Sequence, residues 1–382
     1  MMSKEVAKDA VDLLFKLYEE NDENMVINKH TYGIILDMIG GEPFMNVEVM
    51  DYIVEYFIQQ CCERDHIWLT NFRISISTNG LLYFEPKVQA FLDKYHSLIS
   101  MNVTIDGPKD IHDLCRVDLG GTGSFDRAMA AWNDWFLVKK HNIPDTKVTI
   151  APENLPKIGE IFDFFLSKGC TTIHANPIFE HKWTEEEAQL YYKLLIKLAD
   201  RLLEVEGAES SLFSDFKGEP VPESETNNYC GGTSAMLAFD PQGLAYPCLR
   251  YMASSLSPER KPIVIGNVHG IYNTPEYKAI YDDMKKVTRQ SQSTQECLDC
   301  PVASGCAWCS AENYNEFGTY NKRSTNICWM HRAEALAGVY YWNKYYRKHN
   351  ITKRKKMYLP VDIAMHLITL KEYNKLLLLS KT

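Results

Sequence analysis

Seven cysteines in one stretch of the chain are the residues whose type and spacing point most directly to chemistry. All seven lie between positions 229 and 328, and four of them fall within thirteen residues. Because thiolates bind metal ions and iron–sulfur clusters, cysteines at this density predict a metal centre. The pattern consists of Cys230, Gly243, Cys248, Cys297, Cys300, Cys306, Cys309 and Cys328.

The spacing within this pattern favours iron–sulfur clusters over zinc. A four-cysteine zinc ribbon usually separates its two pairs by about fifteen residues or more. Only five residues separate the two C-x2-C pairs here. Compact cysteine spacings are typical of cluster ligands, and seven thiolates divide into a set of four and a set of three. Zinc stays the alternative metal, and a group of small buried side chains is the alternative without metal.

The other four cysteines are predicted to be structural. Cys61 and Cys62 are adjacent, so on a helix their side chains point to different faces. Cys115 and Cys170 lie in helical or strand-edge context and belong to no ligand spacing.

The composition narrows the class of protein. The 382 residues are 45% hydrophobic and 24% charged, which is typical of a globular chain and excludes disorder. The net charge of −9 disfavours a general nucleic-acid binder, which needs a basic surface. No apolar run reaches the roughly 18 residues of a membrane span, and the N-terminus lacks the pattern of a secretory signal. We therefore expect a cytoplasmic protein without nucleic-acid or membrane partners, whose thiols stay reduced.

The elements that would position the cysteines follow an α/β pattern. Apolar residues recur at helical spacing in five stretches, and short β-rich runs lie between the first four of them and after the fourth. Such an alternation predicts βα units around a parallel sheet, with functional residues at the carboxyl ends of the strands. Ser3 is the expected cap of the first helix. The predicted helices are 6–18, 47–61, 86–95, 158–168 and about 329–349, and the predicted strands are 32–39, 73–77, 101–105, 147–150 and 171–175.

Four segments are expected along the chain. Residues 1–205 carry the alternating pattern, and the motifs within them, which resemble those of a known family, imply a partial barrel. Residues 206–228 are rich in Glu, Ser, Gly and Pro and predict a linker. Residues 229–349 form the cysteine-rich domain with a long helix, and residues 350–382 form a tail.

Several short motifs of the first segment resemble those of radical S-adenosylmethionine (SAM) enzymes. Gly40-Gly41-Glu42-Pro43 follows a strand, as does the glycine–glutamate motif that holds the SAM amino group in that family. The stretches at 75–80 (SISTNG) and 103–116 (VTIDGPKDIHDLCR) resemble the third and fourth strands of the same barrel, and GSFDR at 123–127 also resembles a sequence of that family. The resemblance implies an aldolase-type, TIM-like barrel. It also implies SAM-binding roles for Gly40, Gly41, Glu42, Pro43, Ser77, Asn79, Thr104 and Arg116.

The cysteine pattern resembles the SPASM domain that accompanies such barrels in peptide maturases. One departure is the last pair, which has two intervening residues where the family has three. The resemblance implies two auxiliary [4Fe–4S] clusters. Auxiliary cluster I would take Cys230, Cys248 and Cys309 and leave one iron open. Auxiliary cluster II would take Cys297, Cys300, Cys306 and Cys328.

The resemblance also implies a reaction. The stretch around Cys306 to Trp329 is similar to maturases of cysteine-rich or Cys-repeat ribosomal peptides, which form thioether or related crosslinks. A 5′-deoxyadenosyl radical would remove a hydrogen atom from the precursor peptide, and the resulting radical would couple to a cysteine thiolate near auxiliary cluster I. The clusters would carry away the electron, and flavodoxin or ferredoxin would be the reductant. No catalytic residue is assigned, because Leu249 and Arg250 follow Cys248 where some relatives have an acid.

The C-x3-C-x2-C motif that binds the SAM-cleaving [4Fe–4S] cluster does not occur in the sequence. The residues are therefore expected to begin downstream of that loop and of the first barrel strand, and such a chain would be inactive alone. A truncated fragment, one half of a split enzyme and a degenerate binding protein all fit. The alternative function is a cysteine-rich, zinc- or cluster-bearing module that binds peptides without catalysis. An ordinary TIM-barrel aldolase does not explain the cysteines.

Overall fold

The computed structural model describes residues 1–118, 120–220, 230, 232, 235–303 and 306–381. The chain divides into two compact units, each assembled from three segments. Unit 1 comprises Met1–Val103, Thr226–Gln292 and Cys309–Arg323. Unit 2 comprises Thr104–Glu225, Ser293–Trp308 and Ser324–Thr382. Within the described part of the chain, none of the helices combines the length and the apolar character that crossing a bilayer requires.

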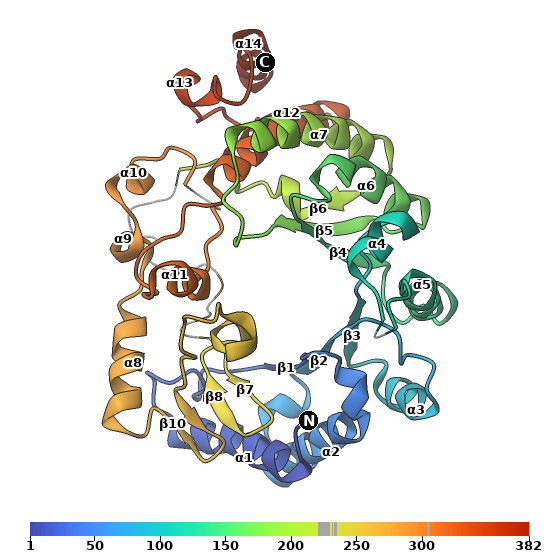
Figure 1. Cartoon of the computed structure of the whole chain (residues 1–382), viewed down its shortest axis with the longest axis vertical. Coiled ribbons are helices and arrows are strands. Elements are labelled where there is room, and N and C mark those ends of the chain that lie inside the picture. Colours follow the sequence, from blue (N-terminus) through green and yellow to red (C-terminus); the bar gives the residue numbers. More distant parts are fainter. Residues whose placement is uncertain (119, 221–229, 231, 233–234, 304–305, 382) are drawn as a thin grey trace. The chain divides into compact units, whose positions relative to one another are not determined.

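Unit 1 is built on a three-stranded parallel sheet in the order β1-β2-β3. Phe72, Ile74 and Ile76 of β2 are buried, whereas Arg73 and Ser77 on the opposite face are exposed. This alternation packs one face of the sheet against helices and leaves the other face polar. The three strands lie side by side in Figure 1. They are β1 (Ile34–Met38), β2 (Phe72–Thr78) and β3 (Ile99–Val103).

The helices of unit 1 begin and end where local signals place them. Ser3 caps the first helix, since its hydroxyl oxygen accepts a hydrogen bond from the Val6 amide at 3.2 Å. Pro86 starts α3 at a position where its missing N–H costs nothing. The helices are α1 (Lys4–Glu20), α2 (Val47–Glu63), α3 (Pro86–Tyr95), α8 (Pro275–Lys285), α9 (Arg289–Gln292) and α11 (Ser310–Phe317).

A small antiparallel sheet in unit 1 carries the first part of the cysteine pattern. Gly243 forms the turn between its first two strands with a φ of +85°, a conformation that strongly favours glycine. The amide of Gly243 donates to the Asp240 carbonyl at 3.0 Å. The strands are β7 (Ala238–Phe239), β8 (Leu244–Tyr246), β9 (Gly266–Asn267) and β10 (Gly270–Ile271).

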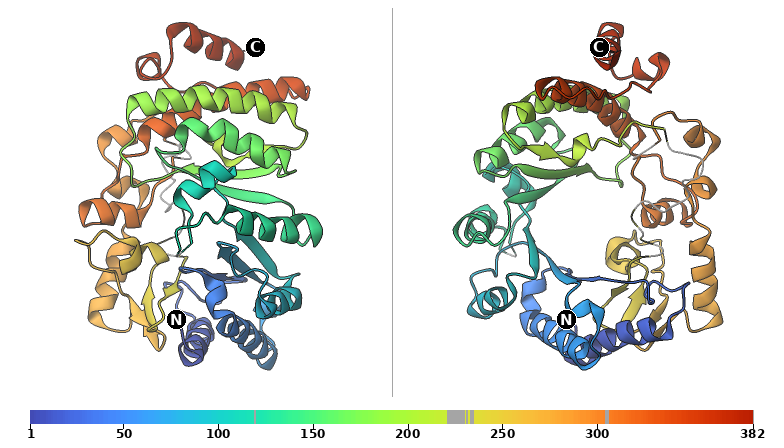
Figure 2. Two further views of the ribbon diagram at one scale, coloured as in Figure 1. Left: turned by 45° about the vertical axis from the view of Figure 1, so that its right-hand side comes forward. Right: turned by 180° about the vertical axis from the view of Figure 1, so that it is seen from behind.

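Unit 2 has a second parallel sheet, in the order β4-β5-β6, and helices that cover it. Its longest helices, α7 and α12, run side by side (Figure 2). Val148, Ile150 and Ile173 supply the buried face of the sheet. The strands are β4 (Asp145–Ile150), β5 (Thr172–Pro177) and β6 (Glu209–Ser210). The helices are α4 (Lys109–Cys115), α5 (Phe125–Asn133), α6 (Ile158–Ser167), α7 (Glu185–Glu204), α10 (Gln295–Leu298), α12 (Cys328–Lys348), α13 (Val361–Ala364) and α14 (Leu370–Lys381).

Two segments have more structure than their polar composition indicates. Within the predicted linker, residues 221–228 lie outside the described residues, but β6 pairs with β5, and Leu212 and Phe213 are buried. Within the predicted tail, α13 and α14 form, and Leu367 and Leu376 are buried. In both segments a few apolar side chains pack although polar residues dominate the average composition.

Candidate metal centres

Three of the seven pattern cysteines come together in unit 1. Cys248 follows strand β8, and Cys309 directly precedes α11. A Cβ atom placed on Gly232 would lie 3.3 Å from the sulfur of Cys230 and 3.9 Å from the sulfur of Cys248. The pKa of Cys248 is raised to about 11, mainly by burial and in smaller part by the neighbouring thiols of Cys309 and Cys230. The three thiols therefore form one group.

Charges around these three thiols partly offset the cost of ionising them. Burial raises the pKa of Cys309, while the positive charge of Arg250 and two backbone amides of α11 lower it. Arg250 is held by Glu312, with 3.0 Å between Nη2 and Oε2. The Glu312 side chain is only 4% exposed. The thiols thus lie beside a cation that a buried carboxylate fixes in place.

One side of this group of three thiols packs against buried, mainly apolar residues, which are called the apolar floor below. Tyr251, Met284 and Ala311 form a fully buried cluster, and Cys248 and Cys309 pack against it. Such a floor lowers the local dielectric and excludes water from one side of the thiols, which strengthens their interaction with a metal.

The other four pattern cysteines all belong to unit 2. Cys297 lies in α10, whose first turn is capped by Thr294, and Cys328 begins α12. The amide of Cys300 donates to the Cys297 carbonyl at 3.4 Å, and that of Cys306 donates to the Ala303 carbonyl at 3.2 Å. All four are half-buried free thiols. The division of the seven cysteines between the units is therefore three and four.

The donor chemistry of both groups fits iron–sulfur clusters, whose usual protein ligands are cysteine thiolates. All eleven cysteines are free thiols. Among the described residues, no three His, Cys, Asp or Glu side chains converge closely enough to hold one metal ion.

Sequence reasoning missed two polar side chains on α12, His331 and Glu334, which are 5% exposed each. Nε2 of His331 lies 3.0 Å from the carbonyl oxygen of Val302, between Cys300 and Cys306. Glu334 accepts hydrogen bonds from Tyr191 and Lys217. The signal for them in the sequence is a histidine and a glutamate three residues apart on an otherwise apolar helical face.

The residues predicted to bind SAM fall into both units. Gly40, Gly41, Glu42, Pro43, Ser77 and Asn79 lie in unit 1, and Thr104 and Arg116 lie in unit 2. In unit 1 the structure brings Glu42 and Asn79 together, since the Asn79 amide donates to Oε2 of Glu42 at 2.8 Å. Oε1 accepts from the Thr78 hydroxyl at 2.8 Å and from the Phe44 amide at 3.1 Å. In unit 2, Nε of Arg116 donates to Oδ2 of Asp106 at 2.6 Å.

The four cysteines predicted to be structural differ in exposure. Cys61 and Cys170 are fully buried, whereas Cys62 and Cys115 are exposed. Burial raises the pKa of both Cys61 and Cys170 to about 12, so their thiols stay protonated near neutral pH.

Comparison with known proteins agrees with the resemblance found in the sequence. A protein-family model described as a 4Fe-4S single cluster domain matches residues 6–125. The uncharacterized protein MJ0907 of Methanocaldococcus jannaschii is 26% identical over 203 residues, which cover 52% of this chain and 62% of that protein. The cysteine-type anaerobic sulfatase-maturating enzyme of Clostridium perfringens is 26% identical over 230 residues, which cover 56% of this chain and 58% of that enzyme. The chain thus matches less than two thirds of the length of these curated relatives.

A solved structure has the same fold over nearly the whole chain. Native anSMEcpe with bound AdoMet and the Cp18Cys peptide matches with a TM-score of 0.62 at 16% identity. The match covers 92% of this chain and 91% of that one. The predicted α/β fold class is therefore confirmed, and the predicted resemblance to a radical SAM maturase is present in both sequence and fold.

Proposed function

We propose that this protein is a radical SAM maturase that modifies a ribosomally made, cysteine-containing peptide. The family-model match and the similarity to a sulfatase-maturating enzyme support the superfamily. A solved neighbour with a bound peptide supports a peptide as the substrate class. The finer part of the proposal is that a cysteine of the peptide takes part in a thioether or related crosslink in the cytoplasm.

The ligand sets are part of the proposal. Auxiliary cluster I takes Cys230, Cys248 and Cys309 of unit 1, and auxiliary cluster II takes Cys297, Cys300, Cys306 and Cys328 of unit 2. The observation that supports this assignment most is the division of the seven thiols into three and four between the two compact units. The mutual effect of the Cys248, Cys309 and Cys230 thiols supports the first set further.

The chain's own residues would bind and orient the reacting groups. SAM with its own cluster supplies the hydrogen-abstracting radical chemistry when both are bound. Three thiolates leave one position of a four-iron cluster open, and a peptide thiolate is the ligand that we assign to it. Arg250 offers a positive charge near that group, and the apolar floor around Tyr251 excludes water.

Metal analysis of the full chain tests the ligand sets. After anaerobic purification we expect about eight irons and eight sulfides per chain and no stoichiometric zinc. Replacing Cys230, Cys248 and Cys309 by serine should remove about half of the iron, and so should replacing the other four cysteines. Replacing Cys62 and Cys115 by serine is the matched control, and it should leave the iron unchanged. Stoichiometric zinc in colourless protein would exclude the assignment and favour a metal-bearing binding module.

A turnover assay tests the substrate class. SAM, a reductant and a cysteine-containing precursor peptide are added to the chain, alone and with a separately made segment that carries a C-x3-C-x2-C loop. We expect 5′-deoxyadenosine and a peptide lighter by the mass of a hydrogen molecule. A peptide with serine in place of cysteine should give no crosslink. Peptide binding without SAM cleavage in every combination would favour the binding module.

A further inference from the structure

Unit 2 contains a buried chain of polar groups that the proposed reaction does not use. The carboxylate of Glu334 on α12 accepts a hydrogen bond from the Tyr191 hydroxyl on α7 at 2.9 Å. It also accepts one from Nζ of Lys217 at 2.7 Å. The Glu334 and Lys217 side chains are 6% and 13% exposed. A buried carboxylate is stable only with such partners, so Tyr191 and Lys217 hold Glu334 in one place.

His331 extends this chain of groups toward the proposed ligand loop. Its Nδ1 lies 3.9 Å from Oε2 of Glu334, within ion-pair distance. Its Nε2 lies 3.0 Å from the backbone carbonyl oxygen of Val302. A carbonyl has no proton to give, so Nε2 carries the proton and donates. This hydrogen bond and the burial of the ring, whose side chain is 6% exposed, fix the orientation of His331.

The position of Val302 in the sequence explains why this hydrogen bond matters for the proposed cluster ligands. Val302 lies between Cys300 and Cys306, and its side chain is 1% exposed. His331 lies three residues after Cys328, about one helical turn along α12. The hydrogen bond therefore joins the segment 297–303, which carries Cys297 and Cys300, to the helix that carries Cys328.

We propose that His331, which lies beside the anchored Glu334, is a positioning residue that fastens the segment 297–303 to α12 and keeps the unit 2 thiols within reach of one cluster. The inference rests on the proposed ligand set of auxiliary cluster II. It assigns no direct metal contact to His331. Residues that hold metal ligands through hydrogen bonds to their loop affect metal affinity without touching the metal.

The packing of α7 against α12 does not require this contact. Tyr191 and Lys217 already satisfy both oxygens of Glu334. If His331 served only the packing of α7 against α12, replacing it would not affect the segment 297–303. The two roles therefore differ in what a substitution changes.

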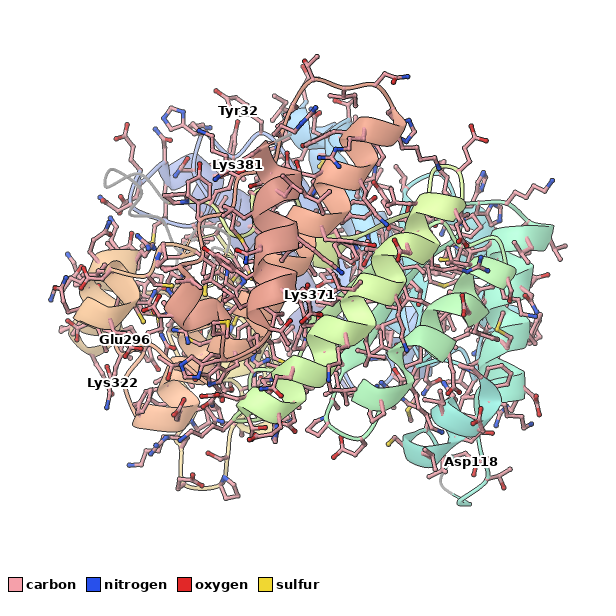
Figure 3. All side chains as sticks on the ribbon, turned by 90° about the horizontal axis from the view of Figure 1, so that it is seen from above. Tyr32, Asp118, Glu296, Lys322, Lys371 and Lys381 are labelled. Carbon is pink, nitrogen blue, oxygen red and sulfur yellow. The ribbon has the colours of Figure 1, made fainter. Side chains whose placement is uncertain are left out.

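The test uses the full chain and three variants of α12. His331→Leu keeps a similar volume and removes the donor, and His331→Gln keeps an amide N–H at the same reach. Arg332→Gln is the matched control. The adjacent Arg332 lies 4.0 Å from Glu296, and Glu296 is 87% exposed. Glu296 lies at the surface (Figure 3), so the loss of this pair should matter little.

Two measurements are made on each variant. Amide hydrogen exchange of the segment 297–303 is followed in metal-free protein, and iron content and the reduction potentials of the clusters are measured after anaerobic reconstitution. We expect about tenfold faster exchange in His331→Leu, the factor expected when one buried hydrogen bond is lost. We also expect loss of about half of the iron, with one cluster signal remaining. His331→Gln should retain both properties, and Arg332→Gln should match the wild type.

Wild-type exchange and iron content in His331→Leu would overturn the inference. Equal loss in His331→Leu and His331→Gln would overturn it too, because the donor would then not be the cause. Faster exchange throughout α7 and α12 would show a packing role and also contradict it. If the wild type binds no iron, the proposed function fails. The exchange data on metal-free protein then still decide whether His331 fastens the segment.

Discussion

The carboxylate of Glu42 accepts a hydrogen bond from the backbone amide of Asn79, 37 residues away in the sequence, at 2.8 Å. The Thr78 hydroxyl donates to the other oxygen at the same distance. Glu42 thus ties the loop after β1 to the carboxyl end of β2, where the neighbouring glycines are predicted to meet SAM.

Replacing Glu42 with Gln should destabilise unit 1. In the glutamine side chain an NH2 group replaces one of the two carboxylate oxygens. This NH2 group then faces the Asn79 amide or the Thr78 hydroxyl, and a buried donor without an acceptor costs about 1–3 kcal/mol. Urea unfolding measures the loss. Glu48→Gln, in α2, changes the same chemistry in an exposed pair with Lys87 and should have little effect. Equal stability of the two variants would show that the Glu42 contacts are not structural.

Replacing Gly243 with Ala should destabilise the hairpin that precedes Cys248. Its φ is +85°, and an added Cβ would lie 3.2 Å from a methyl group of Val268. A left-handed conformation costs a non-glycine residue about 1–2 kcal/mol. Gly159→Ala in α6 is the control, because an added Cβ there has nothing within 4 Å and helical alanine is favourable. Thermal denaturation should move in opposite directions for the two variants.

Removing Arg250 should cost more than removing the whole pair that it forms with Glu312. Arg250→Gln leaves the Glu312 carboxylate buried without its guanidinium, which we expect to cost about 1–3 kcal/mol, since Arg250 is itself partly exposed. In the double variant with Glu312→Gln, part of the loss should return. Urea unfolding of both single variants and the double variant forms the cycle. Additive losses would mean that the two side chains do not interact.

Adjacent cysteines should react very differently with iodoacetamide. Burial raises the pKa of the Cys61 thiol to about 12, whereas Cys62 is exposed. Because the thiolate is the reactive form, Cys62 should be labelled more than about a hundredfold faster at mildly alkaline pH. Fragment-ion mass spectrometry distinguishes labelling at Cys61 from labelling at Cys62. Cys115, which is exposed, and Cys170, which is buried, allow a second comparison of the same type. Equal labelling in folded protein would contradict the burial of Cys61.

Unit 2 should lose stability in acid through Glu334. Burial raises the pKa of Glu334, but the charge of Lys217 and the hydrogen bonds from His331 and Lys217 outweigh it, so the pKa lies below its ordinary value. A carboxyl group with a lowered pKa stabilises the fold above its unfolded pKa of about 4.3, and this contribution disappears as the pH falls through the folded pKa. Tyr191 is the remaining polar group that contacts it, and its pKa is raised well above the usual value.

Urea unfolding of metal-free protein between about pH 3 and pH 7 checks this dependence. Glu334→Gln should be less stable than the wild type at neutral pH and should lose less stability on acidification. Parallel curves for the two proteins would exclude Glu334 as the titrating group.

Local signals in the sequence were sufficient for most elements. The predicted helix 86–95 agrees with α3, because a proline at the first turn and an apolar face define it. Ser3 caps α1 as predicted, and the predicted helix at about 329–349 agrees with α12 within one residue at each end. Helix α7 was not among the predicted elements, although Thr184 and Glu187 form a capping box that marks its start.

The contacts between distant segments could not be predicted. The sequence did not indicate that both oxygens of Glu42 also accept hydrogen bonds from residues at the end of β2. The contact between His331 and Val302 joins residues that are 29 positions apart in the sequence. The periodicity of apolar residues around Glu42 and around His331 does not indicate either contact.

Several residues contact the Glu334 carboxylate, and this affects which substitutions related sequences can accept at these positions. Its partners come from three separate segments: Tyr191 from α7, Lys217 from the loop after β6, and His331 from α12 itself. Replacing Lys217 alone leaves the buried Glu334 carboxylate without its cation, whereas replacing both Lys217 and Glu334 by neutral residues leaves no unpaired buried charge. Among relatives, these positions should therefore be replaced together or retained together. A sequence that keeps Glu334 but has lost both Lys217 and Tyr191 should be rare.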